Sequence, residues 1–456
     1  MTKKIFACIV FIAAFSTLIC AQKADKSSSK PNAEIQKMLR EVSAKRIEAD
    51  IRRLAGFGTR NTNSEQDNPT RGIGAARDWI FAEFQKISAQ CGNCLTVEKQ
   101  AYTQQPTPNR RITQPTVITN VYATLRGTTD PDRIYVVSGH YDSMCQNAAD
   151  GKCDAPGAND DASGTAAVIE MARVMSKRKF DATIIFMAVA GEEQGLLGAA
   201  YFAEQAKEKK MDIEAMFTND IIGGVTTFKN APNRQTVRVF SEGVPSNETE
   251  QEANRRRGTG GENDSPSRQL ARFIKETAEI YSPKFSVMMV YRRDRYLRGG
   301  DHIPFLERGF TAVRITETNE DYDHQHQNVG TREGKFYGDT PEFVDFDYVA
   351  NVTRVNAASL ARLALAPARP KNAGMVTTRL GNDTELRWDA STAPDIAGYE
   401  IVWRDTISPV WTNSVNTGNV TNFVMKGMSK DNYFFGVRAV DREGNKSPVS
   451  YPRPVQ

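Results

Sequence analysis

The sequence predicts an α/β protein with a largely parallel, doubly wound sheet, helices on both faces, and a C-terminal all-β sandwich. Three observations support this prediction. Short apolar runs alternate with segments of helical periodicity through the middle of the chain, which is typical of a parallel sheet. A proline-rich stretch over residues 365–371 then interrupts this alternation. Beyond it, short strands of alternating polarity follow one another with regular turn signals, as in β-sandwiches.

The chain has 456 residues, enough for about two or three domains, and its composition is that of an ordinary globular protein. Hydrophobic residues make up 39% and charged residues 25%, so a substantial core can form. The net charge is only +4. One dense basic cluster, Arg255 to Arg257, lies in a stretch rich in Gly, Asn and Ser that we interpret as a solvated loop. We expect no nucleic-acid partner, because such partners require a basic face.

The N-terminus has the pattern of a secretory signal peptide. Lys3 and Lys4 precede an apolar run over residues 5–19, and the small residue Ala21 comes before a polar stretch. An anchoring helix is the alternative, but a membrane span needs about 20 apolar residues. We therefore expect a signal peptide over residues 1–21 and a flexible leader over residues 22–32. The mature protein would be secreted or periplasmic, with no stable membrane span.

The cysteines divide between this segment and the mature chain. Cys20 leaves lipoprotein attachment open, although the bulky Ile19 before it fits that processing poorly. Four cysteines remain after cleavage: Cys91, Cys94, Cys145 and Cys153. An even number in an exported chain predicts two disulfides, and we expect the local pairs Cys91–Cys94 and Cys145–Cys153. A redox pair at Cys91 and Cys94 is the alternative, but the setting is not that of a thioredoxin-like unit.

Five apolar runs are expected to be strands, and the segments between them helices. The runs cover residues 134–138, 183–189, 215–219, 237–240 and 312–315. The helical candidates cover residues 33–54, 75–87, 164–176, 196–208, 267–280 and 347–365. In such a sheet, sites form beyond the carboxyl ends of the strands. We expect the domain that contains this sheet to span residues 33–368, and the β-sandwich to span residues 372–456.

Histidines and acidic residues gather after the predicted strands. They are His140 and Asp142, Asp160 and Asp161, Glu192 and Glu193, Asp220, and His324 and His326. A single acidic pair is usually a solvated surface feature, but five clusters at strand ends are not easily explained in that way. Imidazole and carboxylate ligands suit zinc, and a carboxylate can bridge two ions about 3.5–4 Å apart. The sequence therefore predicts a site for two metal ions.

At these residues the sequence resembles peptidase family M28, a group of aminopeptidases with a two-zinc site. The resemblance covers about residues 34–365. The matching motifs are SGHYDS (138–143), PGANDDASG (156–164), AGEEQGLLG (190–198) and TND (218–220). The resemblance implies the zinc exopeptidase fold, two zinc ions per chain, and peptide substrates that lose their N-terminal residue.

The resemblance also implies a role for each matching residue. His140 and Asp220 would bind one zinc ion, Glu193 would bind the other, and Asp160 would bridge both. Glu192 would act as the general base that takes a proton from the metal-activated water.

Other roles are less sharply defined by the motifs. Asp142 would act in catalysis by orienting a ligand histidine from behind. His326, or alternatively His324, would complete the second metal site. Both are named because residues 324–328 depart from the His-Thr or His-Ser pattern of the family. Asp301 and His302 match a segment that lines the substrate pocket in relatives. We favour His326 as the ligand.

The C-terminal piece resembles a fibronectin type III domain, with matching stretches at residues 386–388, 398–403 and 432–441. It carries no recognisable catalytic motif, so we expect a spacer or a docking module that could contact a cell surface or a glycan.

Several functions compete on this scaffold. The leading hypothesis is hydrolysis of N-terminal residues from peptides. Cyclisation of N-terminal glutamine, as in the related single-zinc glutaminyl cyclases, and an inactive extracellular binding protein are the alternatives. The bridging Asp160 and the intact Glu192 argue against both. Carboxypeptidases share this metal site, so the end of the peptide that is cleaved stays open.

Overall fold

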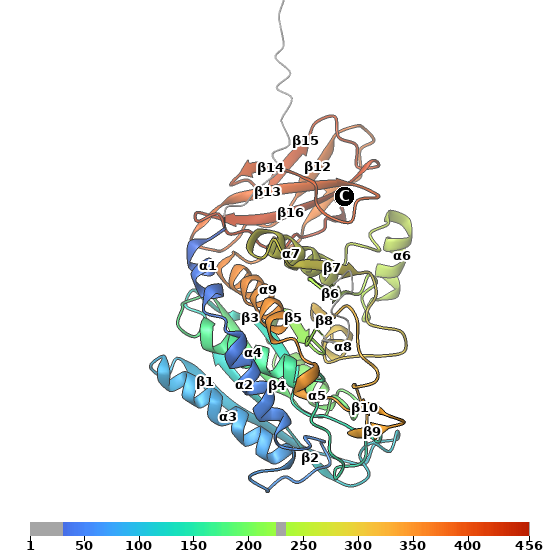
Figure 1. Ribbon diagram of the computed structural model, residues 1–456. Coiled ribbons are helices and arrows are strands. Elements are labelled where there is room, and N and C mark those ends of the chain that lie inside the picture. Colours follow the sequence, from blue (N-terminus) through green and yellow to red (C-terminus); the bar gives the residue numbers. More distant parts are fainter. Residues whose placement is uncertain (1–30, 225–233, 456) are drawn as a thin grey trace, which may run out of the picture.

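The computed structural model describes residues 31–224 and 234–455 (Figure 1). The signal peptide expected over residues 1–21, and nearly all of the leader expected over residues 22–32, lie outside this part of the chain. Within residues 31–224 and 234–455, no helix is both long and apolar enough to cross a membrane.

An eight-stranded mixed sheet runs through the larger part of the molecule, in the order β1-β2-β4-β3-β5-β8-β6-β7 (Figure 1). Its strands are β1 (Leu95–Gln104), β2 (Thr116–Leu125), β3 (Asp130–His140), β4 (Ala182–Val189), β5 (Asp212–Asn219), β6 (Thr236–Phe240), β7 (Ser286–Val290) and β8 (Ala312–Glu317). The central strands β4, β3, β5 and β8 are parallel, whereas β2 and β6 join them in antiparallel fashion. The expected α/β class is confirmed, with the parallel pairing concentrated at the centre.

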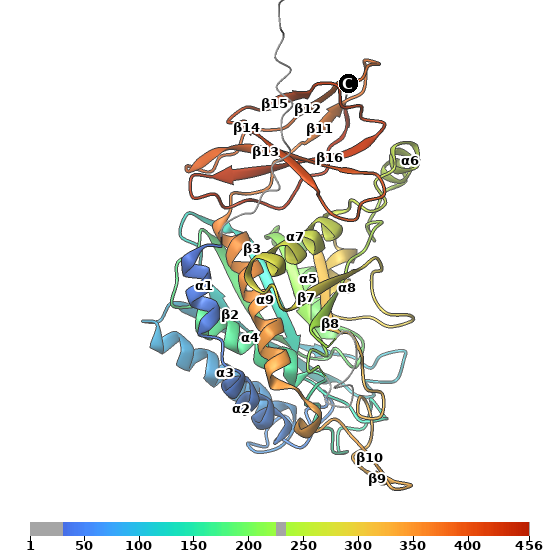
Figure 2. The same cartoon turned by 45° about the horizontal axis from the view of Figure 1, so that its top comes forward.

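Helices cover both faces of the sheet, as expected (Figures 1 and 2). One face carries α1 (Ala33–Arg40), α2 (Ala44–Ala55), α3 (Gly72–Gln90), α4 (Ala162–Met175), α7 (Pro266–Tyr281) and α9 (Phe346–Leu365), and the other carries α5 (Leu197–Glu208) and α8 (His302–Glu307). In β4, Ile184 and Phe186 enter one core while Ile185 and Met187 enter the other. Because both faces are buried, such a strand is a continuous apolar run in the sequence.

The stretch around Arg255 forms a helix, α6 (Glu250–Thr259). The prediction of a solvated loop there is wrong. Thr249 and Glu252 form a reciprocal capping box, in which each side chain accepts the backbone N–H of the other residue. None of the α6 side chains is buried. The helix therefore lacks the apolar stripe that would have revealed it in the sequence.

The C-terminal part of the chain is all-β, as predicted (Figure 2). One sheet has the order β15-β12-β11-β17 and the other the order β14-β13-β16. The strands are β11 (Gly374–Val376), β12 (Thr384–Arg387), β13 (Ile396–Asp405), β14 (Asn413–Gly418), β15 (Asn422–Met425), β16 (Tyr433–Asp441) and β17 (Arg453–Val455). Leu386, Ile401 and Val437 from both sheets share one core. A small hairpin of β9 (Gly330–Arg332) and β10 (Lys335–Tyr337) and a 3-10 turn, η2 (Pro341–Phe343), precede α9.

The β-sandwich docks beside α7, at the amino ends of the central strands (Figure 1). Arg404 of β13 forms an ion pair with Asp264 at 2.7 Å, and Arg438 of β16 forms one with Glu276 of α7 at 3.0 Å. Arg133, near the start of β3, donates hydrogen bonds to backbone carbonyls at the end of α9. The chain leaves the large sheet at this end. The carboxyl ends of the parallel central strands lie at the opposite end of the sheet.

Candidate metal centre

The side chains that were expected to form a site come together beyond the carboxyl ends of the central strands. His140 ends β3, Glu192 and Glu193 follow β4, and Asp220 follows β5. The ligand atoms form two groups, each within 4.8 Å: His140, Glu192 and Asp220, and Asp160, Glu193 and His326. Segments that are far apart in the sequence thus supply one compact cluster.

Asp160 joins the two groups, because each of its carboxylate oxygens faces a different histidine. Asp160 Oδ1 lies 3.1 Å from His140 Nε2, which is also 3.7 Å from Asp220 Oδ1. Asp160 Oδ2 lies 2.9 Å from His326 Nε2, which is also 3.0 Å from Glu193 Oε1. A carboxylate placed in this way could bridge two cations.

The donor atoms of this cluster fit metal ions. His140 Nε2, Asp160 Oδ1, Glu193 Oε1 and His326 Nε2 are buried and form no hydrogen bond within the described part of the chain. Buried polar atoms normally have a partner. Ligands at about 2.1 Å around a tetrahedral zinc ion lie roughly 3.4 Å apart, close to the separations observed here. Imidazole and carboxylate donors are also the chemistry that zinc accepts.

The Asp161 side chain forms hydrogen bonds with three of the segments that contribute residues to the cluster. Its side chain caps α4 by accepting the N–H of Gly164 at 2.9 Å, and it accepts the N–H of His140 at 3.0 Å and of Ile221 at 3.3 Å. The end of β3, the start of α4 and the end of β5 are therefore held at one carboxylate. Asp161 is fully buried, and this burial raises the pKa of its carboxyl well above the usual value.

Asp142 was expected to orient His140, and the structure gives it a wider contact set. His140 Nδ1 lies 3.1 Å from the backbone carbonyl of Asp142 and 3.6 Å from its carboxylate. That contact leaves Nε2 of His140 facing the cluster. The Asp142 carboxylate also accepts the backbone N–H groups of Glu192 at 3.2 Å and Glu193 at 3.1 Å. It thereby fixes the segment that presents both glutamates.

The structure places the two histidines of the 324–328 segment differently. The His324 ring stacks on Phe343 at a centroid distance of 3.6 Å, and its Nδ1 lies 3.1 Å from the carbonyl of Gly338. His326 instead faces Asp160 and Glu193. Only His326 of the pair is therefore placed beside these carboxylates.

Asp301 and His302 are both buried, but they have different surroundings. Neither carboxylate oxygen of Asp301 has a hydrogen-bond partner among the described residues. Burial, together with the nearby charges of Asp142 and Asp220, raises the pKa of Asp301 to about 7. His302 Nε2 lies 2.8 Å from the carbonyl of Arg293, and burial lowers its pKa to about 4. His302 is thus a neutral group that holds the segment around Arg293 in place.

The Glu192 carboxyl lies among charged groups that shift its pKa in opposite directions. Burial raises the pKa of its carboxyl well above the usual value. The positive charge of His140 opposes this rise, whereas the negative charges of Asp220 and Glu193 add to it. For His140, burial opposes protonation, but the nearby carboxylates of Asp142, Asp160 and Asp220 outweigh it and raise the pKa well above 6.5. A bound cation would take over this role of counter-charge.

Three residues that sequence reasoning missed support the cluster. The fully buried Arg314 places Nη1 2.7 Å from Asp220 Oδ2. Asp339 accepts the backbone N–H of Asp160 at 2.7 Å, and Gln325 donates to Asp160 Oδ2 at 2.9 Å. A charge in the middle of a predicted buried strand was a usable signal for Arg314. Asp339 and Gln325 lie in irregular segments and gave no comparable signal.

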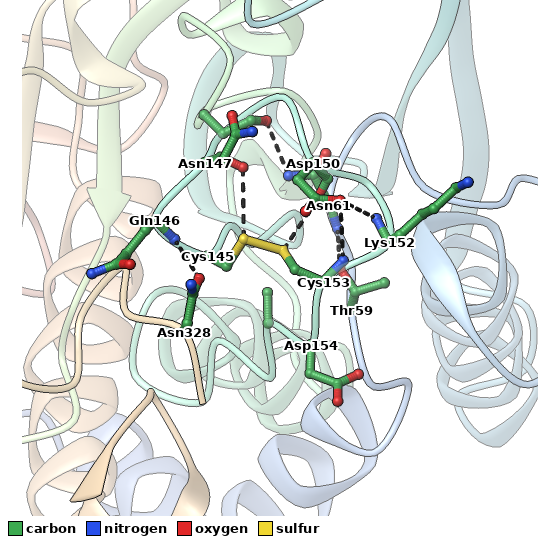
Figure 3. The surroundings of a disulfide bond; sticks show 12 residues. Thr59, Asn61, Cys145, Gln146, Asn147, Asp150, Lys152, Cys153, Asp154 and Asn328 are labelled. Carbon is green, nitrogen blue, oxygen red and sulfur yellow. Dashed lines mark hydrogen bonds between the residues drawn. A yellow bond between two sulfur atoms is a disulfide. The ribbon is translucent and has the colours of Figure 1, made fainter. Parts of the chain in front are cut away.

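Both disulfides have the expected pairing, Cys91–Cys94 and Cys145–Cys153. Cys145 and Cys153 also cluster with Asp150 (Figure 3). Because their sulfur atoms are bonded to each other, they carry no thiolate charge, and this cluster is not a metal site. A cavity of about 700 Å³ lies between α6 and the β-sandwich, at the other end of the sheet from the carboxylates.

Comparison with known proteins agrees with the motifs. The family described as Peptidase family M28 matches residues 120–333. A protein of Leptosphaeria maculans, named a probable zinc metalloprotease, is 48% identical over 93% of this chain and 98% of its own length. The chain belongs to peptidase family M28. A probable zinc metalloprotease of Pyrenophora teres f. teres is 47% identical to this M28 peptidase, over 93% of this chain and 88% of its own length.

Solved structures show the same fold. LapB from Legionella pneumophila has a TM-score of 0.52 at 21% identity, and the match covers 73% of this M28 chain and 75% of LapB. The LapA aminopeptidase of Legionella pneumophila has a TM-score of 0.50 at 18% identity, with coverages of 73% and 75%. The zinc exopeptidase fold expected from the sequence is therefore confirmed for this M28 member.

Proposed function

We propose that this chain is an extracytoplasmic two-zinc exopeptidase that removes N-terminal residues from peptides. Its assignment as a zinc metalloprotease rests on family membership. The observation that carries the finer proposal is the placement of Asp160, which offers one oxygen to each of two ligand groups.

We assign three protein ligands to each of the two zinc ions. His140, Asp160 and Asp220 would hold one zinc ion, and Asp160, Glu193 and His326 would hold the other. Zinc ions held there would lower the pKa of a water molecule and polarise the scissile carbonyl. The unpartnered, buried nitrogen and oxygen atoms of these residues support this assignment.

Glu192 is the proposed general base. Its carboxylate lies within 4.8 Å of the ligand atoms of His140 and Asp220. It takes one proton from the attacking water while the water oxygen bonds to the carbonyl carbon of the peptide. It returns that proton to the leaving amine as the C–N bond breaks. The products are a free amino acid and a peptide shortened by one residue, and Glu192 is regenerated as a carboxylate.

The supporting residues have indirect roles in this proposal. Asp142 positions Glu192 and Glu193 through the backbone N–H groups that it accepts. Asp301 lines the substrate pocket with its unpartnered carboxylate, and His302 holds the segment behind it.

The chain organisation is part of the same proposal. Residues 33–368 would form the peptidase domain, and residues 372–456 a fibronectin type III-like domain that serves as a spacer or docking module. Two disulfides in the mature chain and the pattern of residues 1–21 support export to the periplasm or the medium.

The test combines a metal count with a cleavage profile. We expect two zinc ions per chain by elemental analysis, release of p-nitroaniline from aminoacyl-p-nitroanilides, and loss of single N-terminal residues from a peptide library analysed by mass. Loss of C-terminal residues would instead identify a carboxypeptidase. One zinc ion with conversion of N-terminal glutamine to pyroglutamate would identify a cyclase.

A further inference from the structure

The loop closed by the Cys145–Cys153 disulfide lies directly beside the candidate metal centre. Cys145 is buried and follows Asp142 by three residues, and Cys153 precedes the bridging Asp160 by seven. The disulfide closes a ring over residues 145–153, whose backbone is folded by hydrogen bonds to the Asn147 and Asp150 side chains (Figure 3). The loop is thus a rigid element rather than a free connection.

One side of this loop holds the segment that carries His326. The backbone N–H of Gln146 donates to Asn328 Oδ1 at 3.3 Å (Figure 3). The Gln146 side chain donates to Gln327 Oε1 at 2.9 Å. His326 precedes these two residues directly and has a positive φ of 55°, a conformation that a non-glycine residue adopts only when its surroundings hold it there.

The other side of the loop holds the segment that carries Glu193. The fully buried Gln194 donates from Nε2 to the backbone carbonyl of Ala148 at 3.0 Å. Asn61 donates to the same carbonyl at 3.1 Å. The loop therefore contacts the chain next to both residues that, with Asp160, make up the second ligand group.

The first ligand group has its own support. His140 ends the central strand β3, and Asp220 is paired with the buried Arg314. Because the disulfide loop makes none of these contacts, we expect the geometry of the first group to be retained when the ring is opened.

We propose that the loop 145–153, closed by its disulfide, is a positioning element that holds Glu193 and His326 in place for the second metal ion. This inference rests on the two-ion function proposed above. Opening the ring frees the Gln146 and Ala148 contacts together. The second ion then binds more weakly, while the ion of His140 and Asp220 is retained.

The test compares two double variants of the full chain. C145S/C153S opens this ring, and C91S/C94S opens the other disulfide, which lies at the far end of the sheet between α3 and β1. Serine is used because reduced cysteines would themselves bind zinc. Zinc is titrated against a competing chelator, and the bound metal is counted by elemental analysis.

We expect C145S/C153S to weaken one of the two zinc affinities by about 10–100-fold, the size of effect that outer partners of metal ligands have. C91S/C94S should keep both wild-type affinities. Equal losses in both variants, or two unchanged affinities in C145S/C153S, would overturn the inference. A wild-type chain that binds only one zinc ion would instead refute the two-ion function, and the inference with it.

Two further measurements keep the test decisive if C145S/C153S folds poorly. Q146A removes the side-chain contact to Gln327 at an exposed position, and should weaken the same ion. In an H326A background, which lacks a ligand of the second ion, Q146A should leave the affinity of the remaining zinc unchanged. A loss of that remaining zinc would show that the loop acts on the fold generally, and would overturn the proposal.

Discussion

The two halves of the candidate centre meet at Asp160 but are built differently. On one side, His140 is the last residue of a central strand and is 1% exposed, and Asp220 follows the neighbouring strand. On the other side, His326 lies in an irregular segment after β8, and its side chain is 27% exposed. One half is therefore held by the sheet throughout, whereas the other takes Glu193 from the end of a central strand but depends on a loop for His326.

This difference predicts unequal metal affinities. Ligands that the folded sheet already fixes lose little conformational freedom when an ion binds, whereas ligands on loops must be ordered by neighbouring contacts. We therefore expect the ion of His140 and Asp220 to bind more tightly than the ion of Glu193 and His326. The following substitutions test this contrast.

The largest effect is expected for Glu192→Gln, which removes the proposed base while leaving both halves in place. Turnover of an aminoacyl-p-nitroanilide should fall by about 10²–10⁴-fold, because the amide cannot accept the proton. Zinc content should stay at the wild-type level. Unchanged turnover would show that another residue is the base.

Arg314→Met tests the half that is held by the sheet. The substitution leaves Asp220 buried without its cation, so the free energy of unfolding should fall by about 3–5 kcal/mol in urea titrations. Arg314→Lys keeps the positive charge, so its free energy of unfolding should fall by less. Equal stability of the Met variant and the wild type would mean that the ion pair does not support this half.

His326→Ala and His324→Ala test the half that is held by loops. His326→Ala should lose one of two zinc ions under a chelator that the wild type resists, because Glu193 and Asp160 alone complete the group poorly. His324→Ala should keep both ions, since His324 packs on Phe343 away from the cluster. Loss of an ion from His324→Ala alone would reverse the assignment.

The smallest effect concerns a contact far from the centre. Burial opposes the charged form of Glu276, but Arg438 and Arg362 outweigh it and lower its pKa to about 2. A lowered carboxyl pKa stabilises the fold above the unfolded value of 4.5, and this stabilisation is lost as the pH falls from 4.5 toward 2.

Glu276→Gln should accordingly lower the unfolding temperature most at pH 7, less at pH 3, and hardly below pH 2. The side chain is 33% exposed, so the contribution is about 1 kcal/mol or less. Glu279→Gln, on the same helix but 64% exposed, is the matched control and should show no pH-dependent difference. A difference that persists unchanged at pH 3 would exclude the ion pair as its cause.

The sequence predicted the half held by the sheet better than the half held by loops. His140 and Asp220 follow apolar runs whose pairing into a parallel sheet fixes where they lie. The sequence favoured His326 over His324 but left His324 open, because residues two apart in an irregular segment can point to the same side. The edge strand β1 and its neighbour β2 were missed because polar residues interrupt their apolar pattern.

The distance between the β-sandwich and the candidate metal centre sets a minimum length for a substrate that contacts both. The 11-residue strand β3 spans roughly 36 Å between that end and His140. A polypeptide bound by the sandwich would need about ten extended residues for its terminus to reach the candidate metal centre. Shorter peptides would contact the peptidase site alone. Deletion of the sandwich's surface loops should therefore leave their cleavage rates unchanged.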